Sequence, residues 1–82
     1  MYPMPYQLTK HARRRIAERG LQPEHVYAAV FSGRRVRRGR DRELRYDSHS
    51  RCAVLVCTQE PVIVTAMRLT KRQAKRLWRT IR

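Results

Sequence analysis

The stretch Cys52-Ala-Val-Leu-Val-Cys-Thr-Gln-Glu-Pro-Val-Ile-Val-Thr-Ala-Met67 contains two apolar runs separated by a short polar segment. The runs, 52–57 and 62–67, are rich in β-branched residues and carry no charged side chain. Short runs of this composition are typical of buried central strands. The intervening Gln59-Glu60-Pro61 has the composition of a turn. We therefore predict two adjacent antiparallel strands at the centre of a sheet.

The segment before these runs has a different pattern. Val36, Leu44 and Tyr46 alternate with charged residues, which predicts half-buried strands beside the central pair. Turns are expected at 39–41 and 47–50, which are rich in Gly, Asp and Ser.

Three helices are predicted around these strands. Thr9–Gly20 and Pro23–Gly33 each begin with a residue that favours a helix start and end with a glycine. Thr70 and Gln73 have the spacing of a capping box ahead of a third, amphipathic segment. The order helix, helix, strands, helix predicts an α+β fold. It comprises two N-terminal helices, a small antiparallel sheet of three to four strands and a C-terminal helix. We expect 1–82 to form a single domain, with 1–7 as an irregular N-terminal arm.

The charge of the chain narrows the classes of partner. Lysine and arginine number 20 against six acidic residues, and the net charge is +14. A charge of this size repels itself and favours polyanions or an acidic protein as partners. Most of the cations are arginine, which pairs with phosphate through a planar fork. The alternative is a basic surface that serves only solubility.

Two segments carry most of this charge. The segment 34–45 has seven arginines against Asp41 and Glu43, which predicts a basic β-ribbon able to follow a phosphate backbone. The polar side of the last helix is also basic, and for each segment the alternative is an ordinary solvated face. The expected nucleic-acid-binding residues are Arg34, Arg35, Arg37, Arg38, Arg68, Arg72, Arg76 and Arg79.

The first helix carries a candidate catalytic pattern. His11, Arg15 and Arg19 recur at four-residue spacing, so they share one side of the helix. The two arginines also share the side of Ala12 and Ile16. Because burial of an unpaired charge is unfavourable, they must either reach a carboxylate or line a cleft that receives an anion.

Metal-independent RNA cleavage needs a group that transfers a proton and fixed cations that stabilise the phosphorane. Histidine suits the first role near neutral pH, and arginine suits the second. We add the hydroxyls of Tyr46 and Thr65 as groups that orient phosphate. The alternative for the first helix is an exposed histidine beside arginines that form ion pairs. The alternative for Tyr46 and Thr65 is that they are ordinary core and strand residues.

Other chemistry is not indicated. The scattered histidines and the two cysteines do not predict a metal site, and no cofactor is expected. Cys52 and Cys57 fall on opposite faces of a strand, so they cannot bridge each other. We expect both to be buried in a reducing compartment. With no signal peptide and no apolar run of membrane-spanning length, we predict a cytoplasmic protein without a membrane partner.

The opening Leu8-Thr9-Lys10-His11-Ala12-x-x-Arg15-x-x-x-Arg19-Gly20-Leu21 resembles that of a bacterial family, domain of unknown function four-two-five-eight. Val64-Thr65 matches the valine–threonine pair of that family's last strand, and the resemblance covers roughly Leu8 to Leu69. The family is similar in predicted organisation to the RelE and barnase-like toxins, which are small metal-independent ribonucleases. The resemblance implies a curved antiparallel sheet with the first helix over one end. It also implies that His11, Arg15, Arg19 and Thr65 gather near the sheet.

Our first functional prediction is a metal-independent endoribonuclease of this type. We expect it to be the toxin of a toxin–antitoxin pair, with RNA as substrate, either alone or at the ribosome, and an acidic antitoxin as partner. The chain departs from the pattern in its longer basic C-terminal helix and in retaining only Arg68 on the last strands. The alternative is therefore a non-catalytic basic nucleic-acid-binding domain. A third hypothesis is a structural or phage-derived protein whose charge serves assembly.

Overall fold

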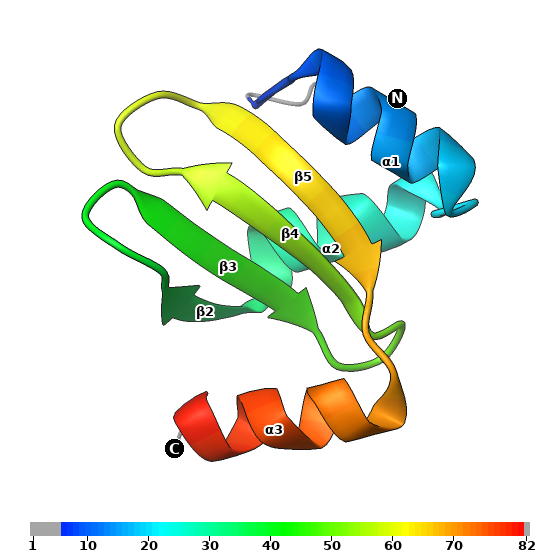
Figure 1. The fold of residues 1–82 in the computed structure, drawn as a ribbon, viewed down its shortest axis with the longest axis vertical. Coiled ribbons are helices and arrows are strands. Elements are labelled where there is room, and N and C mark those ends of the chain that lie inside the picture. Colours follow the sequence, from blue (N-terminus) through cyan, green and yellow to red (C-terminus); the bar gives the residue numbers. More distant parts are fainter. Residues whose placement is uncertain (1–5, 82) are drawn as a thin grey trace.

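The computed structural model describes residues 6–81, and their side chains as far as Arg79. It has the predicted α+β class and combines three helices with a five-stranded sheet (Figure 1). In chain order the elements are β1 (Gln7–Leu8), α1 (Lys10–Glu18), α2 (Pro23–Ser32), β2 (Arg34–Arg37), β3 (Arg42–Asp47), β4 (Cys52–Cys57), β5 (Val62–Arg68) and α3 (Lys71–Ile81).

The strand order is β1-β5-β4-β3-β2. The prediction of three to four antiparallel strands was wrong, because β1 adds a fifth strand that runs parallel to β5. Two hydrogen bonds to the β5 side of the sheet hold β1, from Gln7 N to Pro61 O at 2.7 Å and from Thr9 N to Ile63 O at 3.2 Å. Gln7 is thus in a strand and not in an irregular arm, while residues 1–5 of that arm lie outside the described part. No local pattern marks a two-residue strand that depends on a distant partner.

The helices lie on both faces of the sheet (Figure 1). The sequence predicted that they pack on the sheet but did not specify which face each helix covers. We call the first face, covered by α1 and α2, the α1–α2 face; its core includes Ala12, Val30 and Ile63. We call the other the α3 face; its core includes Tyr46 and Leu77. The molecule therefore has two small cores, one on each side of the sheet.

The predicted helix ends are confirmed. Thr9 caps α1, because its hydroxyl accepts a hydrogen bond from Ala12 N at 3.0 Å. Gly20, just beyond α1, has a φ of 58°, a left-handed conformation that favours glycine. Thr70 and Gln73 form the expected capping box: Gln73 N donates to Thr70 Oγ1, and Thr70 N donates to Gln73 Oε1.

An irregularity in β5 decides which way its side chains point. Leu55 pairs with Thr65, whereas the next residue, Val56, pairs with Ile63, so Val64 is an extra residue in the ladder. Side chains of directly paired residues lie on the same face. Thr65 therefore shares the α3 face with Leu55, and Ile63 shares the α1–α2 face with Val56.

Candidate nucleic-acid interface

The predicted catalytic residues of α1 begin with His11 and Arg15. His11 is exposed, and its Nε2 accepts a hydrogen bond from Arg15 Nε at 3.5 Å. Arg15 is half-buried and forms an ion pair from Nη1 to Glu18 Oε2 at 3.0 Å. Of the two outcomes expected for these arginines, Arg15 shows the first, because it reaches a carboxylate.

Arg19 lies against the margin of the sheet. Its Nη1 donates a hydrogen bond to the main-chain oxygen of Ala66 at 2.8 Å. Ala12, one turn from the start of the helix, is fully buried, while Ile16 is only half-buried. α1 thus packs on β5 as expected, and Arg19 contacts a backbone carbonyl instead of a carboxylate.

Tyr46 and Thr65 lie across the sheet from α1. Tyr46 is only 2% exposed and belongs to the core of the α3 face. Burial raises the pKa of its phenol above the ordinary value. Thr65 is half-buried on the same face, opposite Leu55. The sheet therefore separates these two hydroxyls from His11, Arg15 and Arg19, and the structure does not bring the five residues together.

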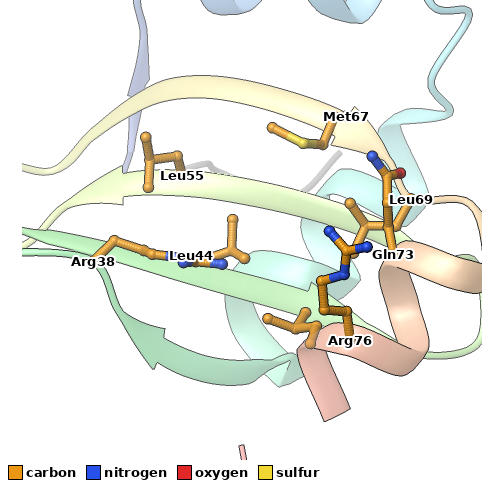
Figure 2. Close-up of a pocket in the computed structure, with 8 residues that line it drawn as sticks. Arg38, Leu44, Leu55, Met67, Leu69, Gln73 and Arg76 are labelled. Atoms are coloured by element: carbon orange, nitrogen blue, oxygen red, sulfur yellow. The ribbon is translucent and has the colours of Figure 1, made fainter. Parts of the chain in front are cut away.

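The α3 face contains a groove between the sheet and α3, with a volume of about 500 Å³ (Figure 2). Its floor is apolar and its rim is polar. Leu44, Leu55, Met67, Leu69 and Leu77 form the floor, and Arg38, Gln73 and Arg76 form the rim. In Figure 2, Arg38 and Arg76 approach the groove from opposite ends.

The cations of α3 continue from this rim along the outer side of the helix. They line a hollow of about 290 Å³. Arg40, in the turn between β2 and β3, borders a further hollow together with Arg37 at the end of β2. We call the combined surface the α3–hairpin surface; it comprises Arg38, Arg40, Lys71, Arg72, Lys75, Arg76 and Arg79.

The other arginines predicted to bind nucleic acid are divided. Arg34 stacks over the ring of Trp78, 5.3 Å from its centroid, and so borders α3. Arg35 is exposed on the opposite face, with its Nε 3.9 Å from Glu43 Oε1. Arg68 is exposed at the end of β5 and pairs with Cys52, which places it on the α1–α2 face. Arg37 pairs with Glu43 and lies on the α1–α2 face as well. Four of the eight predicted residues therefore belong to the α3–hairpin surface, and Arg34 lies beside it.

Arg45 was counted with the basic ribbon, but it is buried, with 8% exposure. It donates hydrogen bonds to Glu43 Oε1 and to Val30 O, each at 2.9 Å, and lies 5.1 Å from the centroid of the Tyr6 ring. Burial lowers the pKa of its guanidinium, but the hydrogen bonds with Glu43 and Tyr6 raise it above the usual value. No local signal distinguishes Arg45 from its neighbours, since only tertiary packing decides which arginine of an alternating strand faces a helix.

The sequence also missed the apolar floor of the groove. Leu55 and Met67 were predicted simply as residues of buried strands, yet both are only half-buried and line this groove. The sequence did contain a signal for this exposure. Only one helix follows β5, and one helix cannot cover a whole face of the sheet.

The cysteines are both free: Cys52 is buried as expected, and Cys57 is only half-buried. Within residues 6–81, no three side chains of His, Cys, Asp or Glu come together in a way that would hold a metal ion. None of the helices in that range has both the length and the apolar character needed to cross a membrane. No family model, no curated protein and no solved structure matches the chain.

Proposed function

We propose that the chain binds nucleic acid through the α3–hairpin surface, mainly by contacts with phosphate groups. One observation carries the proposal: Arg38 and Arg76 border the same groove, so the basic turn and the basic helix form one surface. No acidic residue occurs anywhere in 61–82, and α3 therefore contributes cations without counter-charges of its own. Arginine forks on a continuous surface suit a phosphate backbone.

Two of the acidic residues form ion pairs elsewhere in the molecule. Glu18 pairs with Arg15 on α1, and Glu43 pairs with the buried Arg45. Both ion pairs lie on the side of the sheet away from α3. These two carboxylates therefore do not neutralise the cations of the α3–hairpin surface, which favours the approach of a polyanion to this side.

Fluorescence anisotropy with labelled RNA and DNA tests the proposal. Phosphate contacts release counterions, so six or more contacts lower the affinity by about three orders of magnitude between 50 and 200 mM salt. We expect Arg72→Ala with Arg79→Ala to weaken all sequences alike and to reduce the salt slope by about two.

A matched control removes the same charge from α1. Arg13 and Arg14 are exposed there, and their double alanine variant should leave the salt slope nearly unchanged. Equal losses in the two double variants would contradict the proposed surface. Absence of binding by the wild-type chain at 50 mM salt would overturn nucleic-acid binding itself.

Metal-independent RNA cleavage is our second candidate. The exposure of His11 and its contact with Arg15 favour it, because a proton-transfer group then stands beside a cation at the surface. The reduced site contains His11 and Arg15, without Tyr46 and Thr65.

Cleavage of a labelled RNA, with and without ribosomes, tests this second candidate. We expect His11→Ala to lower the rate by roughly two to four orders of magnitude. His49→Ala is the control, since His49 is exposed in a turn. DNA of the same sequence lacks the attacking 2′-hydroxyl and should be bound but not cut. Equal rates for His11→Ala and wild type would remove His11 from the site, whereas no cleavage by the wild type would leave only the binding function.

A further inference from the structure

The groove on the α3 face exposes apolar surface at the centre of a strongly basic region. Leu55 and Met67 on its floor are only half-buried, although they lie on the two central strands. Removal of apolar surface from water is favourable, so such a floor favours an apolar occupant. A phosphate backbone alone offers nothing to cover it.

The rim of the groove carries groups of a different kind. Arg38 and Arg76 approach from opposite ends, so an occupant of the floor lies between two cations (Figure 2). Gln73 also borders the groove, and its Oε1 accepts a hydrogen bond from Thr70 N at 2.8 Å. The Nε2 amino group of Gln73 is therefore the donor that it presents at the rim.

We propose that this groove receives one unpaired base of a single-stranded nucleic acid, with the flanking phosphates on Arg38 and Arg76. The inference rests on the proposed function and names the form of nucleic acid that this surface prefers. A nucleobase has an apolar face and polar edges, which match the floor and the donor of Gln73. In a duplex these faces are stacked, so a duplex reaches the arginines but leaves the apolar floor uncovered.

The dimensions of the groove favour a base over a protein helix. A volume of about 500 Å³ is within the range of pockets for small ligands, roughly 300–1,000 Å³. A stable protein interface instead buries about 800 Å² on each partner. A charge of +14 on an 82-residue chain also selects an occupant that carries negative charge on both sides of its apolar part.

Binding of four 12-nucleotide probes to the wild-type chain tests the inference. The probes are single-stranded RNA, single-stranded DNA, an abasic strand with the same number of phosphates, and a duplex. We expect the abasic strand and the duplex to bind about tenfold more weakly than the single strands. A preference for single-stranded RNA over single-stranded DNA would indicate a contact with the 2′-hydroxyl. Equal affinity for the two strands would indicate that only the base and the phosphates are recognised. Both results support the inference.

The outcomes separate this inference from the proposed function. Equal affinity for the abasic and the complete strands would overturn the proposal that the groove binds a base, and would favour a protein as its occupant. Phosphate binding by the α3–hairpin surface would not be affected by that result. Failure of all four probes to bind at 50 mM salt would overturn both.

Variants localise the effect to the groove. Met67→Gln places an amide on the floor and should weaken the complete strand about fivefold without changing the affinity for the abasic strand. Phe31→Gln is the matched control, because Phe31 is 51% exposed on α2. It should change neither affinity. Equal weakening of both strands by Met67→Gln, or a loss of base preference in Phe31→Gln, would contradict the groove as the site. Thermal unfolding of each variant checks that it is folded.

Discussion

Arg19 of α1 donates a hydrogen bond to the carbonyl oxygen of Ala66 on β5, at a distance of 2.8 Å. Thr9 at the start of the same helix donates from its hydroxyl to Val64 O at 3.1 Å. The pairing of β1 with β5 ends at Ile63, so both carbonyls lie beyond the reach of that short strand. Side chains at the two ends of α1 thus satisfy main-chain groups of β5, and Arg19 has a structural role at the sheet margin.

Arg19→Ala should lower the free energy of unfolding by about 1 kcal/mol, because it removes the hydrogen bond to Ala66 O while the site remains open to water. Urea denaturation measures the change. Arg13→Ala removes an exposed arginine from the same helix and should change stability by no more than about 0.5 kcal/mol. Equal losses in the two variants would show that the effect comes from helix propensity and not from the contact.

Arg45→Ala should be more destabilising, at about 3 kcal/mol, because it leaves Glu43 and Val30 O without their buried donor. Arg35→Ala is the matched control, since Arg35 is exposed and lies 3.9 Å from the same carboxylate. That variant should cost less than about 1 kcal/mol. Chemical denaturation measures the free energy of unfolding of both variants. Equal losses in Arg45→Ala and Arg35→Ala would contradict the buried role of Arg45.

Gly33→Ala should prevent stable folding. A Cβ at this position would collide with Ala29 O and would lie 2.8 Å from Tyr46 O, and both obstacles are backbone atoms. Gly20→Ala provides the comparison, because the space around Gly20 is open and only its positive φ is unfavourable. We expect a cost of about 1 kcal/mol for Gly20→Ala. Circular dichroism during thermal unfolding distinguishes a shifted transition from a missing one.

Cys52 should resist alkylation in the folded protein. Burial, assisted by the charge of Asp47, raises the pKa of its thiol from 9.0 to about 11. At pH 8.5, iodoacetamide should therefore modify the half-buried Cys57 first, and both cysteines should react in urea. Mass spectrometry of time points measures the order. Modification of Cys52 at the rate of Cys57 under native conditions would contradict this environment.

The same shift predicts how stability depends on pH. The folded chain holds the Cys52 proton more tightly than the unfolded chain does, so this contribution is complete below about pH 9 and is lost as the pH rises towards 11. The raised pKa of Tyr46 acts in the same direction at alkaline pH. Urea midpoints measured from pH 8 to 11 should fall, and Cys52→Ala should fall less steeply. A constant midpoint in the wild type would contradict the prediction.

Several elements could be predicted from local signals in the sequence. Thr9 and the Thr70–Gln73 pair define helix starts through hydrogen bonds spanning three residues, and Gly20 and Gly33 define helix ends. The runs 52–57 and 62–67 became the central strands β4 and β5, because short β-branched apolar runs are buried whatever their partners are. The charge of the chain likewise indicated a polyanionic partner before any fold was known.

The way these elements pack together depends on contacts between residues that are distant in the sequence. β1 exists because Pro61 and Ile63 supply acceptors far along the chain, and the extra residue Val64 sets the face on which Thr65 lies. Side chains alternate between faces with a period of two, so one extra residue moves every later side chain of the strand to the face opposite to the one it would have in an uninterrupted ladder. The sequence therefore grouped Thr65 with His11, whereas the fold separated them by a sheet and assembled the basic groove on the other face.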